Sequence, residues 1–191
     1  SGIIAQQLAH YYPEYAHKLT RPVVPGVLAG DVHPWRKAPA DGGIVGFVGR
    51  EWQRKGLPLA AEIVARLRQE RPHLQMWVVG PEEREVQHLF AGWPDGYRLF
   101  GWRSDAEHFR EIDVLLHPAK VEPYGMVITE AMAAGISVVV SDKCGAATQV
   151  TSDAGMVVPL AAPLEQWVDA VRSQLQRATA PPPYVHGWDD V

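Results

Sequence analysis

Short apolar runs separated by helical patterns dominate the chain from Gly43 onward. The runs are continuously apolar rather than alternating, which is typical of strands that are buried on both faces of a parallel sheet. The six predicted strands are residues 43–48, 74–79, 97–100, 113–117, 136–140 and 155–158. Because helical patterns alternate with these strands, the sequence predicts an α/β fold in which helices cover a parallel sheet.

The segments between the strands carry apolar stripes at helical spacing. The first stripe is Ala60, Ile63, Val64 and Leu67, and the last is Leu164, Trp167, Val168, Val171 and Leu175. Such stripes predict amphipathic helices that pack on the sheet. Ser104 and Glu107 add the S-x-x-E pattern of a capping box, which predicts a further short helix before the fourth strand.

Both ends of the chain differ from this pattern. Residues 1–40 are interrupted by prolines, among them Pro22, Pro25, Pro34 and Pro39, and residues 181–183 are three consecutive prolines. A chain of 191 residues suits one ordinary domain. We therefore expect residues 41–178 to form that domain, residues 1–40 an interdomain or linker-like segment, and residues 179–191 a C-terminal tail.

Composition and charge narrow the class of protein. Hydrophobic residues make up 47% and charged residues 21%, as in globular domains. The net charge of -4 argues against a nucleic-acid-binding surface, so any phosphate site must be local. The single cysteine, Cys144, cannot form an internal disulfide or a Cys-based zinc site, which favours a reducing cytoplasm. No run approaches the roughly 20 apolar residues of a membrane span, and a start at Ser1 suggests an internal cut.

Basic residues follow the first predicted strand. The segment GREWQRKG places Arg50, Arg54 and Lys55 in a strand-to-helix loop, with Gly56 at the helix start. In open parallel sheets ligands bind at the carboxyl ends of strands, and guanidinium, ammonium and a helix amino end all attract a diphosphate. The loop therefore predicts a phosphate cradle, with solvated loop charges as the alternative.

Two glutamates surround a predicted helix start after the fourth strand. In HPAKVEPYGMVITEAMAAG, His117 ends the strand, Glu122 lies in the loop, and Glu130 lies about one turn inside a helix that begins near Gly125. Carboxylates accept hydrogen bonds from sugar hydroxyls, while the helix start offers free N–H groups to an anion. Glu122 and Glu130 can thus grip the ends of one elongated ligand, although alone they could be surface charges or a cap. His117 is expected either to touch the ligand or to pack.

The string EPYGMVITEAMAAG resembles the E-x7-E signature of glycosyltransferase family four, the glycosyl transferases group 1, which have the GT-B fold. GREWQRKG resembles the basic loop of that family, VVGPE the turn after its second strand, and YRLFGWRSD the segment that reaches the nucleotide base. The resemblance covers residues 43–177 and implies a Rossmann-like parallel sheet flanked by helices, the C-terminal donor-binding domain of a GT-B enzyme. PGVLAGDVHPW, with Asp31 and Trp35, is similar to the interdomain segment, and YVHGWDDV to the start of a crossover helix.

The resemblance implies a retaining enzyme that transfers a sugar from a nucleoside diphosphate sugar to an acceptor. Arg50 and Lys55 would bind the diphosphate and stabilise the leaving group, and Glu122 would meet hydroxyls of the donor sugar; these three are the expected catalytic residues. Glu130 would hold the ribose. The other implied donor-binding residues are Gly49, Tyr124, Gly125, Met126, Val127, Trp102 and Arg103, the last two beside the base.

The resemblance also implies what the site would need. No cofactor is expected, a UDP-sugar is favoured as donor, and, without a D-x-D motif, the cationic loop is expected to replace a metal. The acceptor-binding N-terminal domain of the family is missing, so the chain should bind donor without turnover. The expected setting is cytoplasmic synthesis of envelope polysaccharide, lipopolysaccharide or glycolipid, with peripheral contact of the full-length protein at the inner membrane face as a further option.

One segment departs from the family pattern. After the fifth strand CGAATQV keeps Gly145 but has Ala146 and Gln149 where the family often carries glycine and glutamate. Two alternatives therefore stay open. One is a non-catalytic nucleotide-sugar-binding module, which Ala146 and Gln149 favour. The other is a GT-B-related sugar-nucleotide epimerase, which would need its own acid and base.

Overall fold

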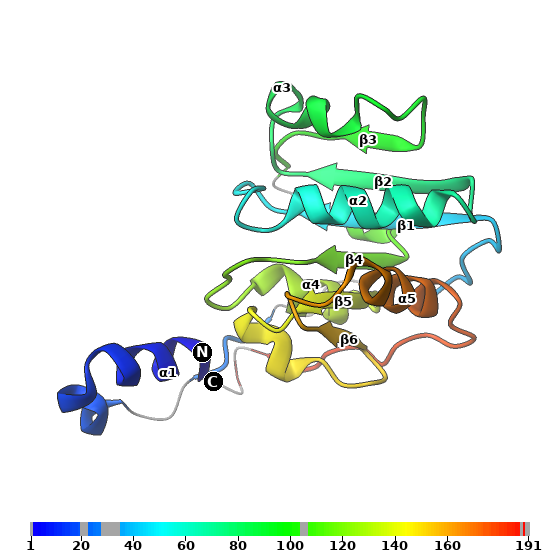
Figure 1. The fold of residues 1–191 in the computed structure, drawn as a ribbon. Coiled ribbons are helices and arrows are strands. Elements are labelled where there is room, and N and C mark those ends of the chain that lie inside the picture. Colours follow the sequence, from blue (N-terminus) through cyan, green and yellow to red (C-terminus); the bar gives the residue numbers. More distant parts are fainter. Residues whose placement is uncertain (1, 20–22, 28–34, 104–106, 188, 190–191) are drawn as a thin grey trace.

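Six parallel strands form a single sheet in the computed structural model, which describes residues 2–19, 23–27, 35–103, 107–187 and 189 (Figure 1). The strands are β1 Gly42–Val48, β2 His73–Val79, β3 Tyr97–Leu99, β4 Val114–His117, β5 Ser137–Ser141 and β6 Gly155–Val158. Their order across the sheet is β3-β2-β1-β4-β5-β6. The predicted α/β fold with a Rossmann-like parallel sheet is confirmed, and each predicted strand boundary lies within one residue of the observed one.

The middle of the sheet contains a change of direction. β1 pairs with β2 along its whole length, from Gly42 beside His73 to Val48 beside Val79. On its other side β1 pairs with β4, through Val45 beside Val114. The chain thus builds the sheet outward from β1 in one direction and then returns to build it in the other. Loops that leave neighbouring strands at such a point part to opposite faces, and in open α/β sheets ligands bind there, outside the carboxyl ends of the strands.

Helices cover both faces of the sheet (Figure 1). α2 Leu57–Arg68 and α5 Leu164–Leu175 pack on one face, where Phe47, Ile63 and Trp167 belong to the same buried cluster. α4 Met126–Ala133 covers the opposite face with a second cluster that contains Leu115 and Ile128. Each fully buried side chain of this size contributes about 1.5–3 kcal/mol, so both layers hold the strand ends in place.

Short helical segments complete the connections. They are α3 Glu83–Val86, η2 Gln87–Phe90, η3 Glu107–Arg110 and η4 Gly145–Gln149. The helix predicted from the S-x-x-E pattern is the 3-10 segment η3, while Ser104 itself lies outside the described residues. No helix in the described part of the chain is long and apolar enough to cross a membrane.

The N-terminal flank holds an element that the sequence analysis did not predict. Residues 1–40 were expected to be linker-like, but α1 Gly2–Tyr11 and η1 Pro13–Lys18 are helical. None of the residues in α1 is buried, and α1 ends before the prolines on which the linker-like prediction rested. Asp31 lies outside the described residues.

The two flanks meet each other. The Val27 N–H donates to the His186 carbonyl over 3.0 Å, and the Tyr184 N–H donates to the Met132 carbonyl at the end of α4 over 3.1 Å. Residues 181–187 contain no helix, whereas Trp188, Asp190 and Val191 lie outside the described residues. The crossover helix at the C-terminal tail therefore stays a prediction.

Candidate functional site

The loops that follow β1 and β4 are packed directly against each other. The Lys120 N–H donates to the Arg54 carbonyl over 2.8 Å. Gly56 begins α2 with a φ of 84°, and a Cβ there would overlap the Pro118 carbonyl oxygen. Only glycine permits this approach without strain. The structure thus brings together the basic loop and the first glutamate of the two sequence motifs.

The Glu122 backbone is fixed by the loop after β5. Its N–H donates to the Lys143 carbonyl over 3.0 Å, its carbonyl accepts the Gly145 N–H over 3.0 Å, and it forms an isolated parallel bridge with Cys144. The Ala146 N–H donates in turn to the Tyr124 carbonyl over 2.7 Å. The segment in which this chain departs from the family pattern therefore supports the loop that carries Glu122.

The Glu122 side chain is buried in a cluster of cations. Lys55 Nζ lies 2.6 Å from Glu122 Oε2, and an Arg54 guanidinium nitrogen lies 3.5 Å from the same oxygen. Arg54 also donates to the Val121 carbonyl and to Glu51. It therefore joins the two loops, a role that the sequence analysis did not assign to it.

Gly49 sets the path of the Lys55 side chain. Gly49 directly follows β1 and has a φ of 151°, and a Cβ at this position would overlap the Lys55 Cδ. Its N–H donates to the Val79 carbonyl over 2.8 Å. The missing side chain thus leaves a channel through which the Lys55 stem reaches the carboxyl edge of the sheet.

The electrostatics of the cluster keep Glu122 ionised. Burial by itself raises the pKa of Glu122, but the His117 Nε2 group, at a long 3.7 Å from Glu122 Oε2, and the charges of Lys55 and Arg54 outweigh it and lower that pKa to about 2. His117 is completely buried in β4 and stacks on Phe47, with ring centroids 6.3 Å apart. Burial lowers the pKa of His117, so its imidazole is neutral at neutral pH. The cluster therefore holds a charged carboxylate beside a neutral imidazole.

The amino end of helix α4 directly follows the loop that carries Glu122. Gly125 is its N-cap with a φ of 94° and provides no side-chain cap, so the first N–H groups, those of Met126 and Val127 among them, have no intrahelical partner. Glu130 lies in the second turn and keeps contact with solvent. Partial burial raises the pKa of Glu130, and the charge of Lys55 lowers it, which shows that the two side chains belong to one electrostatic environment.

The remaining predicted residues lie around this centre. Tyr124 is half-buried, and its hydroxyl makes no hydrogen bond to any described residue. Arg50 is exposed and forms no ion pair within the described parts of the chain. Trp102, 57% exposed, and Arg103 follow β3 at the same edge of the sheet, because the Gly80 N–H donates to the Gly101 carbonyl over 2.7 Å and links the ends of β2 and β3.

The arrangement suits an elongated ligand with an anionic middle. Lys55, Arg50 and the uncapped amino ends of α2 and α4 attract negative charge. Glu122 and Glu130 offer acceptors for hydroxyl groups on either side. Among the described residues, no group of three His, Cys, Asp or Glu side chains is arranged to hold a metal ion.

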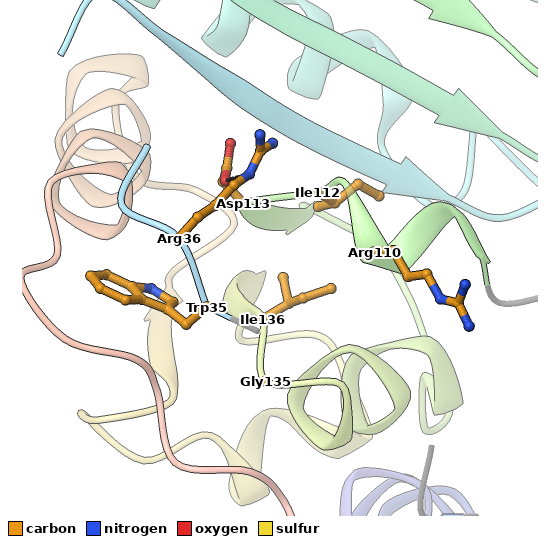
Figure 2. A pocket seen from close by; sticks show the side chains of 7 residues that line it. All are labelled: Trp35, Arg36, Arg110, Ile112, Asp113, Gly135 and Ile136. Atoms are coloured by element: carbon orange, nitrogen blue, oxygen red, sulfur yellow. Dashed lines mark ion pairs between the residues drawn. The ribbon is translucent and has the colours of Figure 1, made fainter. Parts of the chain in front are cut away.

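A second pocket lies at the opposite edge of the sheet. Figure 2 shows the Arg36 and Asp113 side chains next to each other in this pocket, with Trp35 and Ile136 on its other walls. Arg36 Nε lies 3.2 Å from Asp113 Oδ1, and the Ile44 N–H donates to Asp113 Oδ2 over 2.7 Å. Both oxygens of Asp113 are thus engaged with the protein, so this pocket holds the chain before β1 against the sheet and offers little free chemistry.

Known proteins share this combination of fold and motif. The family model described as glycosyl transferases group 1 matches residues 42–177. The lipopolysaccharide core biosynthesis glycosyltransferase LpsE of Rhizobium meliloti (strain 1021) is 38% identical over 106 residues, which are 53% of this chain and 30% of LpsE. The lipopolysaccharide glucosyltransferase WaaG of Escherichia coli (strain K12) is 31% identical over 146 residues, which are 74% of this chain and 38% of WaaG.

Solved structures show the same fold. The crystal structure of WaaG matches with a TM-score of 0.66 and 28% identity, over 74% of this chain and 40% of that one. HepE of Anabaena in complex with UDP-glucose matches with a TM-score of 0.57 and 22% identity, over 71% of this chain and 43% of that one. The chain thus spans roughly a third of the length of the curated relatives named above.

Proposed function

The chain belongs to the glycosyl transferases group 1, and on that premise we propose that it binds the sugar-nucleotide donor of a retaining, metal-independent glycosyltransferase. The observation that carries the proposal is the meeting of Lys55 with Glu122 beneath the uncapped start of α4. A nucleoside diphosphate sugar has the matching order of groups, with hydroxyls on both sides of a diphosphate.

The diphosphate is assigned to the cationic part of the site. Lys55 and Arg50 contact the phosphate oxygens, together with the first N–H groups of α4. As the bond to the sugar breaks, negative charge develops on the departing nucleotide, and these fixed positive groups stabilise it more than they stabilise the bound donor. In this proposal the cations take the part that a metal ion plays in other enzymes.

The hydroxyl-bearing groups are assigned to the two glutamates. Glu130 accepts hydrogen bonds from the ribose, and Glu122, whose low pKa keeps it an acceptor, meets the hydroxyls of the donor sugar. Trp102 and Arg103 lie on the rim, where an aromatic ring and a guanidinium can stack on the base.

The names of the relatives support a proposal for the acceptor and the setting. LpsE and WaaG are named for lipopolysaccharide synthesis, so we assign this protein to transfer onto lipopolysaccharide or a related envelope glycan at the cytoplasmic face of the inner membrane. Both relatives are much longer than the matched segment. We therefore propose that the chain by itself binds the donor and that turnover needs the rest of a longer protein.

The first experiment is calorimetric titration of the chain with UDP, GDP and ADP and with their glucose conjugates, in the presence of a chelator. UDP-glucose is the first probe because the structure of HepE, which shares the fold, contains it. We expect one nucleotide pair to bind with chelator present. Lys55→Ala and Glu130→Ala should each weaken that binding about 10- to 100-fold, since a hydrogen bond to a charged group contributes about 1.5–3 kcal/mol.

Two exposed positions provide matched controls. Lys37 is exposed in the segment before β1, and Glu62 lies on the exposed side of α2. Lys37→Ala and Glu62→Ala remove the same charges and should leave donor binding unchanged. Donor binding that vanishes with chelator would overturn metal independence, and no binding to any nucleotide by the folded chain would overturn the donor-site assignment.

Two alternatives share donor binding and differ in turnover. A non-catalytic module and an epimerase would both bind the nucleotide sugar. Ala146 is buried and Gln149 accepts a hydrogen bond from the Tyr184 hydroxyl over 3.3 Å, so both departures from the family pattern are part of a packed structure. Acceptor-dependent release of nucleotide by the whole protein would distinguish transfer from both alternatives.

A further inference from the structure

His117 is a completely buried imidazole whose two ring nitrogens make no hydrogen bond to any described residue. Burying such a group without a partner costs about 1–3 kcal/mol, so nearly all buried polar groups in folded proteins are paired. An apolar residue of similar size would pack against Phe47 without that cost. The two ring nitrogens are therefore hydrogen-bonding groups that no described residue satisfies.

A carboxylate oxygen of Glu122, which Lys55 already holds, lies close to the His117 ring. His117 Nε2 lies 3.7 Å from Glu122 Oε2, just beyond hydrogen-bond distance, whereas Lys55 Nζ lies 2.6 Å from the same atom. In the proposed function Lys55 also contacts the donor diphosphate. The Lys55 ammonium has three N–H groups, and a bound diphosphate competes with Glu122 for them, which weakens the hold of Lys55 on the carboxylate.

We propose that His117 is a positioning residue that takes over Glu122 from Lys55 when the donor binds. The inference rests on the proposed function. A shift of less than 1 Å brings Glu122 Oε2 within reach of the Nε2–H group, which leaves Oε1 for the sugar. The hydrogen bond holds the carboxylate at the angle at which it meets the sugar hydroxyls.

The surroundings of His117 suit this role. β4 pairs with β5 at His117 beside Val140, so the backbone is anchored within the sheet. The ring stacks on Phe47 with an interplanar angle of 18°, which restrains its rotation. Arg54 is the remaining cation near Glu122, but it is also tied to Glu51 and Val121. His117 is thus the rigid donor against which Glu122 can be set.

The test compares the affinity for the nucleotide alone with the affinity for the nucleotide sugar. His117→Leu removes the donor at similar size, and His117→Gln restores an N–H group near the position of Nε2. With UDP and UDP-glucose as probes, we expect the leucine variant to lose affinity for UDP-glucose about tenfold and to bind UDP within about twofold of the unsubstituted chain, because water solvates Glu122 when no sugar is present. The glutamine variant should recover most of the loss.

A control variant and the contrary outcomes complete this test. His73→Leu changes an exposed histidine at the opposite edge of the sheet and should alter neither affinity. Equal losses for UDP and UDP-glucose, or equal behaviour of the leucine and glutamine variants, would overturn the positioning role while leaving donor binding intact. If the unsubstituted chain binds neither these nor the GDP and ADP pairs, the proposed function fails, and this inference fails with it.

A second measurement needs no variant. The imidazole nitrogens of the unsubstituted chain can be followed by NMR during titration with UDP-glucose. We expect the Nε2–H signal of His117 to move downfield and to exchange more slowly with water as the hydrogen bond forms. An unchanged signal at saturating UDP-glucose would overturn the proposal even if the leucine variant does not fold.

Discussion

Two buried carboxylates at opposite edges of the sheet differ in how the fold treats their charge. Glu122 and Asp113 have nearly the same exposed fraction, 9% and 7% of their side chains. Burial raises the pKa of both, but the pKa of Glu122 ends at about 2, whereas that of Asp113 stays above its ordinary value. Similar burial therefore does not decide in which direction the pKa moves.

The partners explain the difference. The Lys55 side chain is only 15% exposed and lies 2.6 Å from Glu122, while the Arg36 side chain is 49% exposed and lies 3.2 Å from Asp113. A buried cation acts through a low dielectric, and an exposed one is screened by water. At the carboxyl ends of the strands, the buried Lys55 thus keeps Glu122 charged, and a binding site needs such a permanently charged acceptor. The amino edge uses a carboxylate mainly to accept the Ile44 N–H and to hold the chain before β1.

Removing each cation should expose this difference most strongly. Lys55→Met leaves the buried charge of Glu122 without its closest partner, and we expect a loss of about 3 kcal/mol in the free energy of unfolding. Arg36→Met removes a half-exposed partner and should cost less than about 1 kcal/mol. Urea unfolding of the two variants at pH 7 measures both values.

The double variant Lys55→Met with Glu122→Gln provides the control. It removes the buried charge together with its partner and should recover much of the stability that Lys55→Met loses. Equal costs for Lys55→Met and Arg36→Met would show that Arg54 and His117 already satisfy Glu122, and the contrast between the two edges would fail.

Lowering the pH should change the contributions of the two carboxylates to stability in opposite directions. The folded pKa of Glu122 lies below its ordinary value of 4.5, so the unfolded chain binds the extra proton and stability falls as pH drops from about 4.5 toward 2, by up to about 1.4 kcal/mol per pH unit. The folded pKa of Asp113 lies above 3.8, so the folded chain binds the proton first and stability rises as pH falls through that pKa.

Substitutions at the two positions separate these contributions. Glu122→Gln should flatten the acid loss of stability, so its difference from the unsubstituted chain shrinks as the pH falls below 4.5. Asp113→Asn should remove the opposing gain and make the acid loss steeper. The measurement is the free energy of unfolding in urea between pH 5 and pH 3, and parallel curves for both variants would contradict the pKa directions of the two groups.

The sequence predicts the fold of the sheet and the edge at which the site lies, because both depend on local patterns. Continuous apolar runs predicted all six strands within one residue, and the rule that ligands bind at strand carboxyl ends placed Lys55, Glu122 and Glu130 together. The motif also predicted the start of α4 at Gly125.

The contacts between distant loops were beyond such patterns. The pairing of Lys55 with Glu122, the role of Arg54 between the loops and the position of His117 beside Glu122 depend on how the loops approach at Gly56 and Pro118. No spacing of residues in the sequence predicts that these two loops come into contact. α1 was missed for a different reason, since the prolines from Pro22 onward led the whole of residues 1–40 to be interpreted as linker-like.

Two glycines offer the finest comparison between the edges. Gly49 and Gly43 have φ angles of 151° and 113°, so alanine at either position strains the backbone by about 1–2 kcal/mol. At Gly49 the new methyl also displaces the Lys55 stem, whereas at Gly43 it meets Leu175 Cδ2 at 3.1 Å and Asp113 Oδ2 at 3.3 Å.

We expect similar losses of stability from the two alanines, measured by urea unfolding. Only Gly49→Ala should also weaken donor binding in calorimetry, by about tenfold, because a charge-assisted hydrogen bond to phosphate depends on where the ammonium lies. If Gly43→Ala weakens donor binding as much, the loss of affinity comes from a distortion of the whole sheet. The position of Lys55 over Gly49 would then not determine donor affinity.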